Sequence, residues 1–231
     1  MANNNKTSLS SIADIKHALY INLKHRIDRR EHVEQQLALI GITSPTRFNA
    51  IKLPNGALGC SMSHLRCLQI AKEEKWPHLL LCEDDIQFLD PTLFVKQING
   101  FLENHEDDST WDVLLIAGNN MPPYGIEDDY SARVFQCQTT TGYLVKQHYY
   151  DKLIANIKGG IEKLIKEPHN HRFYAIDKYW FNLQQEDYWF LITPLTVVQR
   201  EDYSDIEKRI TNYKKAMTDL DKESYFRRVA K

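Results

Sequence analysis

Apolar residues occur along this chain in short runs that alternate with longer segments of mixed polarity. The runs are rich in Leu, Ile, Val and Tyr, which is typical of buried strands. The mixed segments place apolar residues at helical spacing. In residues 24–40, Val33, Leu37 and Ile40 repeat in this way, and Gly41 follows as a stop signal. The alternation predicts an α/β fold with a mainly parallel central sheet flanked by helices.

The expected elements can be given by their residue ranges. The strands are expected at 17–23, 46–50, 78–82, 111–117, 133–137, 140–145, 188–192 and 195–198. The helices are expected at 24–40, 58–75, 91–104, 147–166 with a break at Gly159 and Gly160, and 173–185. We further expect residues 1–15 to be frayed, residues 16–206 to form a single domain, and residues 207–231 to form a charged helical tail.

Composition narrows the class of protein. The chain has 231 residues, 42% hydrophobic and 26% charged, with a formal net charge of -2, so neither disorder nor a strongly basic nucleic-acid-binding surface is expected. No apolar run approaches the roughly 20 residues of a membrane-spanning helix, and the first residues lack the apolar core of a signal peptide. The four cysteines show no Cys-x-x-Cys spacing. These features predict a cytoplasmic protein with reduced thiols, without a disulfide or zinc framework.

The most informative segment is the acidic triplet Glu83, Asp84 and Asp85, which directly follows the apolar run 79–82. Adjacent carboxylates repel one another, and a divalent cation removes that penalty. Mn²⁺ and Mg²⁺ prefer oxygen ligands, and ligands of open α/β sheets collect at the carboxyl ends of strands. The segment therefore predicts a metal site, although a solvated acidic turn has the same composition.

Three further segments suggest binding chemistry. Residues 20–30 lead from a strand through a basic stretch into a helix, which suits phosphate but also fits a charged helix face. Residues 59–65 place small polar residues at an expected helix start, where free N–H groups attract anions and Ser61 or Ser63 are alternative helix caps. Residues 173–181 place Asp177 among aromatic side chains, which suits a sugar or an ordinary core.

Taken in order, these segments resemble glycosyltransferase family 25, the lipooligosaccharide and procollagen galactosyltransferases. The similarity extends over residues 16–206. The matching stretches are Tyr20-Ile-Asn-Leu23 with Asp28-Arg29-Arg30, Gly59-Cys-Ser-Met-Ser-His64, Cys82-Glu-Asp-Asp-Ile86 and Thr140-Thr-Gly-Tyr-Leu-Val145, with weaker matches at Ala175-Ile-Asp177 and Tyr203-Ser-Asp205.

The resemblance implies a GT-A-type nucleotide-binding sandwich and transfer of galactose or glucose from a UDP-sugar to a glycan or other hydroxyl acceptor, as in glycan and lipopolysaccharide biosynthesis. It implies Mn²⁺, or Mg²⁺ in its place, as the cofactor, with Asp85 and Glu83 as metal ligands. The implied nucleotide-sugar pocket consists of Asn22, Leu23, Arg29, Ser61, Ser63, His64, Glu83 and Asp84. Because the family inverts the sugar's configuration, it also implies a carboxylate base, for which Asp177 and Asp205 are the candidates.

Two other functions fit the same residues. One is a non-catalytic descendant that binds a sugar or a nucleotide on the same scaffold. The other is a metal-dependent nucleotidyltransferase, which also needs carboxylates around a diphosphate, although the chain lacks a Gly-rich triphosphate loop.

Overall fold

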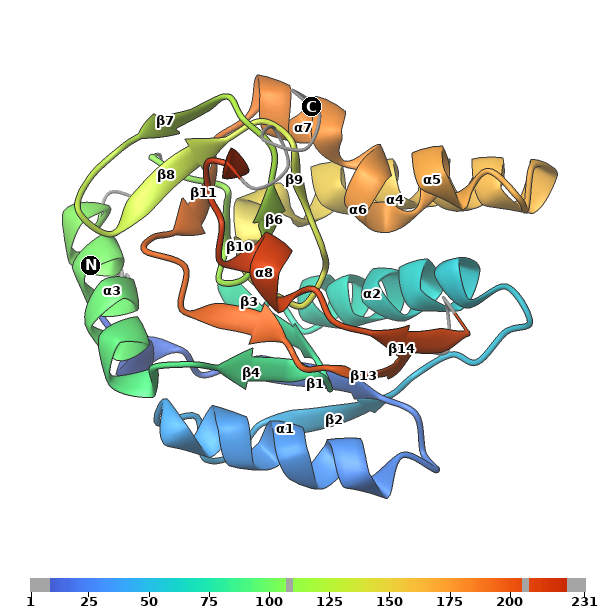
Figure 1. Cartoon of the computed structure of the whole chain (residues 1–231), viewed down its shortest axis with the longest axis horizontal. Coiled ribbons are helices and arrows are strands. Elements are labelled where there is room, and N and C mark those ends of the chain that lie inside the picture. Colours follow the sequence, from blue (N-terminus) through green and yellow to red (C-terminus); the bar gives the residue numbers. More distant parts are fainter. Residues whose placement is uncertain (1–8, 107–109, 205–207, 224–231) are drawn as a thin grey trace, which may run out of the picture.

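The computed structural model describes residues 9–106, 110–204 and 208–223, and its centre is one large sheet (Figure 1). This sheet has eight strands in the order β2-β1-β3-β10-β5-β11-β8-β7. The strands are β2 (Thr46–Asn49), β1 (Ala18–Asn22), β3 (His78–Glu83), β10 (Gly142–Lys146), β5 (Val113–Leu115), β11 (Trp189–Ile192), β8 (Ser131–Val134) and β7 (Tyr124–Ile126). All except β10 and β8 point in the same direction, so the predicted mainly parallel sheet is confirmed.

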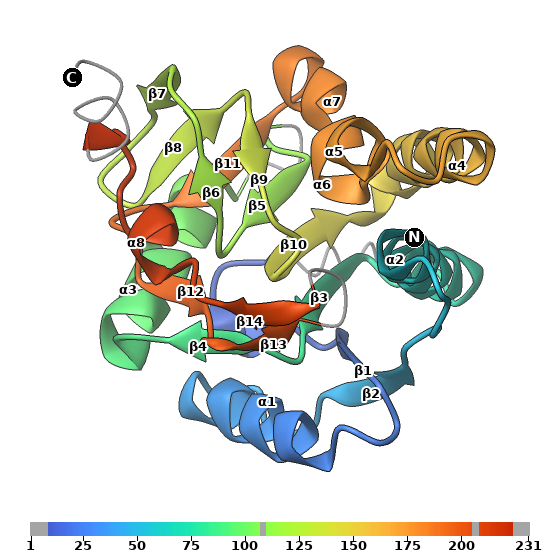
Figure 2. The same ribbon diagram turned by 45° about the vertical axis from the view of Figure 1, so that its right-hand side comes forward.

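Helices cover both faces of the sheet, as Figures 1 and 2 show. Alternate residues of β3 supply the two cores: Leu80 and Cys82 join one, and Leu79 and Leu81 join the other. The first core includes α1 (Ile27–Leu39) and α3 (Pro91–Asn104). The second core includes α2 (Gly56–Glu73), α4 (Tyr150–Lys166), α6 (Ile176–Tyr179) and α7 (Phe181–Glu186). The expected α/β sandwich is therefore present.

Smaller elements complete the described part of the chain. Two-stranded sheets are formed by β4 (Ile86–Phe88) with β12 (Val197–Gln199), by β13 (Asp202–Ser204) with β14 (Arg209–Thr211), and by β6 (Asn119–Asn120) with β9 (Cys137–Gln138). The short helices are η1 (Ile12–Asp14), η2 (Gln147–Tyr149), α5 (His171–Tyr174) and α8 (Lys214–Met217). Within the described residues, no helix combines the length and the apolar character that crossing a membrane requires.

Two helix predictions need correction. Helix α4 continues through Gly159 and Gly160, where we expected a break. A side chain at either position would lie about 3 Å from Tyr179 or from the backbone of residue 174, so these glycines let neighbouring helices approach α4. The helix expected over 173–185 is instead three short helices, because the backbone is extended at Ala175 and the chain turns again at Trp180.

The two ends of the described chain also differ from expectation. Residues 9–15 are not frayed, since Leu9, Ile12 and Ile15 are buried in the core beside α3. Residues 208–223 are not one helical tail. They contain β14, which pairs with β13, and α8, whose Met217 is fully buried. Residues 1–8 and 224–231 lie outside the described residues.

Candidate active site

Three parallel strands end together at one edge of the sheet. In the register of β1 with its neighbours, Asn22 pairs with Asn49 and Ile21 pairs with Glu83. The residues that follow β1, β2 and β3 are therefore brought to the same edge, as the position of the acidic triplet predicts. Side chains that are distant in the sequence meet there: Asn22 Nδ2 donates to Asp84 Oδ2 over 2.7 Å.

The acidic triplet is divided between two environments. Glu83 is the last residue of β3, and Asp84 and Asp85 form the turn into β4. Glu83 faces helix α2, whereas Asp84 and Asp85 face Arg29 of α1. The three carboxylates therefore have different hydrogen-bond partners, although all three line the same pocket.

Glu83 is held by hydrogen bonds from three side chains. Its Oε1 atom accepts from Thr140 Oγ1 at 2.8 Å, from His64 Nε2 at 3.2 Å and from Cys60 Sγ at 3.4 Å. His64 is fully buried, and its Nδ1 lies 3.0 Å from Tyr143 Oη. Burial raises the pKa of Glu83, but the hydrogen bonds from His64, Thr140 and Cys60 outweigh burial, so that its pKa lies below its usual value. Glu83 is thus a stabilised carboxylate.

Asp84 and Asp85 share one cationic partner, Arg29. The Arg29 Nη1 atom lies 2.9 Å from Asp84 Oδ1 and 3.3 Å from Asp85 Oδ2, and its Nε donates to Asp202 Oδ2 over 3.0 Å. Gln199 Nε2 also donates to Asp85 Oδ2, over 2.9 Å. Arg29 therefore neutralises part of the negative charge of these carboxylates. The sequence alone suggests that a metal ion does so.

A cation fits this site at Asp85 Oδ1. This oxygen is buried and has no hydrogen-bond partner among the described residues. Burial and the nearby carboxylate of Glu83 raise the pKa of Asp85 to about 7, and Arg29 opposes this only in part. An uncompensated buried carboxylate oxygen is costly, and it is the ligand type that Mn²⁺ and Mg²⁺ prefer. By contrast, both oxygens of Asp84 already accept hydrogen bonds, from Arg29 and Asn22.

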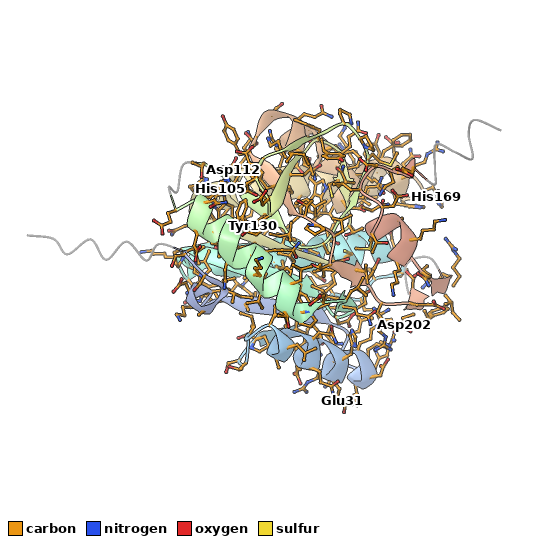
Figure 3. The ribbon with its side chains drawn as sticks, turned by 60° about the vertical axis from the view of Figure 1, so that its left-hand side comes forward. Glu31, His105, Asp112, Tyr130, His169 and Asp202 are labelled. Carbon is orange, nitrogen blue, oxygen red and sulfur yellow. The ribbon has the colours of Figure 1, made fainter. Side chains whose placement is uncertain are left out.

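A pocket lies in front of the triplet. Of the residues expected at a nucleotide-sugar site, it is lined by Leu23, Arg29, Ser63, Glu83 and Asp84, and Asp85 is also part of its wall. The β13–β14 hairpin contributes Ser204, Lys208 and Thr211. In Figure 3, Asp202 of this hairpin lies at the lower right and His105 at the upper left. The structure therefore brings most of the expected residues to one cavity.

Three expected pocket residues lie behind this wall. Asn22 and His64 are buried and reach the site through Asp84 and Glu83 respectively. Ser61 donates to the carbonyl oxygen of Ala57 within α2. None of the three is among the pocket-lining residues of the described chain. Asn22 and His64 therefore hold the acids in place, whereas the hydrogen bond of Ser61 stays within α2.

The interpretation of residues 59–65 as a helix start is wrong. Helix α2 begins earlier, at Gly56, and Asn55 is its N-cap, accepting from the backbone N–H of Leu58 at 3.2 Å. Neither Ser61 nor Ser63 caps the helix; both donate back to carbonyl oxygens one turn earlier. The N–H groups of this segment are consequently not free to receive an anion.

Of the two candidate bases, Asp177 lies in the described part of the chain and Asp205 does not. Asp177, on α6, accepts from the backbone N–H of Thr139 over 3.2 Å, and burial raises its pKa. It is not among the described residues that line the pocket, although Thr140, next to its partner, contacts Glu83. Asp205 lies outside the described residues.

Sequence reasoning missed several residues of the site. Gln199 and Asp202 lie more than a hundred positions from the triplet, and no local pattern places them there. Arg26 lines the pocket and pairs with Asp202 at 2.9 Å. Cys60 had a signal that could have been used, because it lies four residues before His64 and shares its helix face.

Comparisons with known proteins place few constraints on this site. No family model matches the sequence, and no curated protein matches it. Similar solved structures include a mannose-1-phosphate geranyltransferase from Thermus thermophilus, 10% identical, covering 76% of this chain and 73% of that chain with a TM-score of 0.45. A glycosyltransferase involved in glycosylation of the major capsid of PBCV-1 is 14% identical and covers 76% of this chain and 92% of that one, with a TM-score of 0.42.

A third similar structure is a Drosophila galactosyltransferase in complex with manganese, UDP-Gal and xylobiose. It is 16% identical, covers 59% of this chain and 51% of that one, and has a TM-score of 0.34. At these identities and TM-scores, none of the three similarities contributes to the functional assignment, which rests on the geometry of the site.

Proposed function

We propose that this chain is a metal-dependent glycosyltransferase that moves a hexose, galactose or glucose, from a UDP-sugar to a hydroxyl group of a glycan or other acceptor, with inversion. The observation that supports this most is Asp85 Oδ1, which is buried beside Arg29 at the wall of a pocket and has no hydrogen-bond partner in the part of the chain that the structure describes. A cation ligand and a guanidinium at one point are the two groups that a diphosphate requires. The resemblance of residues 16–206 to family 25 is consistent with this chemistry.

The charges of the site suit the bond that must break. When the sugar–phosphate bond breaks, negative charge develops on the departing nucleoside diphosphate. Mn²⁺ or Mg²⁺ bound at Asp85 would supply Lewis-acid stabilisation of that charge. Arg29 faces the same pocket and presents its planar fork to carboxylate oxygens, which a diphosphate resembles in charge and geometry. On donor binding, Arg29 would thus exchange carboxylate oxygens of Asp84 and Asp85 for oxygens of the diphosphate.

The acceptor hydroxyl must lose a proton as it attacks the anomeric carbon. Asp177 is our candidate for the base, because burial raises its pKa and so favours proton uptake. Asp177 accepts from Thr139, and the next residue, Thr140, donates to Glu83, so the proposed acceptor position is on this side of Glu83. Asp205 is the alternative base.

The proposal is tested by incubating the protein with UDP-, GDP- and CMP-sugars, Mn²⁺ and a panel of glycan acceptors, and measuring nucleotide release. We expect release from a UDP-hexose, and a loss of at least about 100-fold in Asp85→Asn. Asp151→Asn, at an exposed site on α4, is the matched control and should retain full activity. Wild-type turnover by Asp85→Asn would contradict the metal assignment.

Two other outcomes would replace the proposed function. Donor binding by calorimetry, without transfer or hydrolysis across the panel, would indicate a non-catalytic binding protein. Formation of a nucleotide-sugar from a nucleoside triphosphate and a sugar phosphate would indicate a nucleotidyltransferase.

A further inference from the structure

Cys60, His64 and Glu83 place a thiol, an imidazole and a carboxylate around one small volume. Cys60 and His64 lie four residues apart on one face of α2, and Glu83 ends β3 opposite them. One ligand atom from each of the three lies within 4.8 Å of the other two. Among the described residues, this is the one group of three or more such side chains with this spacing.

The distances match those between ligands of a tetrahedral zinc ion. With bonds of about 2.3 Å to sulfur and about 2.0 Å to nitrogen and oxygen, neighbouring ligand atoms lie roughly 3.2–3.8 Å apart. Glu83 Oε1 lies 3.4 Å from Cys60 Sγ and 3.2 Å from His64 Nε2. The hydrogen bonds now made to this oxygen therefore hold two of the three atom pairs at the separation that a metal ion requires, and the third pair, Cys60 Sγ and a ring nitrogen of His64, lies within 4.8 Å.

The surroundings also have the features of a metal site. His64 Nδ1 lies 3.0 Å from Tyr143 Oη, so the tautomer with the proton on Nδ1 can donate to that oxygen and leave Nε2 free as a ligand. Thr140 Oγ1 donates to Glu83 at 2.8 Å and orients its carboxylate. Cys60 and Glu83 line the pocket, whereas His64 is buried behind them, so the three side chains border the cavity from which an ion would enter.

We propose that Cys60, His64 and Glu83 form a binding site for a zinc-class divalent cation, separate from the hard-cation position at Asp85. A thiolate and an imidazole select Zn²⁺ or Co²⁺ over Mn²⁺ and Mg²⁺, whose preferred ligands are oxygens. On binding, the Cys60 thiol proton is released to solvent, and the His64 proton lies on Nδ1. This site does not depend on the proposed transferase activity.

The test is a titration of the metal-free protein with Co²⁺, which reports a thiolate ligand by a sulfur-to-cobalt charge-transfer absorption. We expect one equivalent to produce this absorption in wild type and Zn²⁺ to abolish it. Cys60→Ser should lose the absorption and weaken Zn²⁺ binding by at least about tenfold in competition with a chelator. Cys67→Ser, at a fully buried site on α2, and Asp85→Asn should both retain it.

Absence of the absorption in wild type, or its persistence in Cys60→Ser, would overturn the proposal. A second measurement needs no variant and so does not depend on the folding of Cys60→Ser. Cys60 is the one half-buried thiol of the four, all of which lie in the described chain, so alkylation should modify it first. Zn²⁺ should slow that reaction and Mn²⁺ should not; equal rates with and without Zn²⁺ would contradict the site.

Discussion

Glu83 and Asp85 are separated by one residue, yet their carboxylates experience opposite environments. Glu83 accepts three hydrogen bonds from α2 and from the segment before β10, and these favour its charged form. Asp85 shares a single guanidinium with Asp84, leaves one buried oxygen without a partner among the described residues, and has its pKa raised to about 7. Neighbouring acids of one motif can therefore differ in partners and in pKa, because each side chain points to a different part of the fold.

The largest expected effect that separates the two acids is on turnover. Removing the charge of Asp85 removes the proposed cation ligand, so Asp85→Asn should lose at least about 100-fold in Mn²⁺-dependent nucleotide release. Glu83→Gln keeps the shape of a residue whose Oε1 already serves internal donors, and should lose roughly tenfold or less. Equal losses in both variants would show that Glu83 binds the catalytic metal directly.

For the free energy of unfolding we expect the reverse order: substitution of Glu83 should have a larger effect than substitution of Asp85. Glu83→Ala leaves His64 and Thr140 without their acceptor in a buried site, which should cost about 2–4 kcal/mol. Asp85→Asn removes a buried charge that is incompletely paired, and should change stability by less than about 1 kcal/mol at about pH 7.5. Urea unfolding in the presence of a chelator measures both. A larger loss for Asp85→Asn would mean that its pairing with Arg29 is structural.

The pH dependence of stability should distinguish Asp85 from its amide variant. Because its pKa is raised to about 7 from the usual value of 3.8, folded metal-free protein holds a proton there that the unfolded chain releases at lower pH. The free energy of unfolding of wild type should therefore fall, relative to Asp85→Asn, by on the order of 2–3 kcal/mol between about pH 5 and pH 7, and level off above it.

Urea unfolding at several pH values in chelator measures this difference, with Asp151→Asn as a control that follows wild type. A difference that is constant with pH would show that Asp85 is already ionised throughout this range.

The smallest expected effect concerns Arg29, whose guanidinium contacts Asp85 but not Glu83. Arg29→Lys keeps the charge but loses the planar fork that joins Asp84, Asp85 and Asp202. Donor affinity by calorimetry should fall about tenfold, or about 1.4 kcal/mol. Arg66→Lys, on the exposed side of α2, is the matched control and should bind the donor as wild type does. Unchanged affinity in Arg29→Lys would indicate that Arg29 only holds the acids in place.

The sequence by itself determined the class of fold and predicted the position of the candidate site along the chain. Short apolar runs indicate strands, and amphipathic segments indicate helices, because the spacing of apolar residues reflects which positions are buried. The sudden change from the apolar run Leu79–Cys82 to three acids marks the end of a strand. Only the tertiary structure decided which partners these acids have. Gln199 and Asp202 reach them from distant segments, Cys60 and His64 come from a helix opposite, and Asn55 rather than a serine caps that helix. The physical reason is that periodicity records burial, a local property, whereas hydrogen bonds and ion pairs are made between whichever side chains packing brings within about 3 Å.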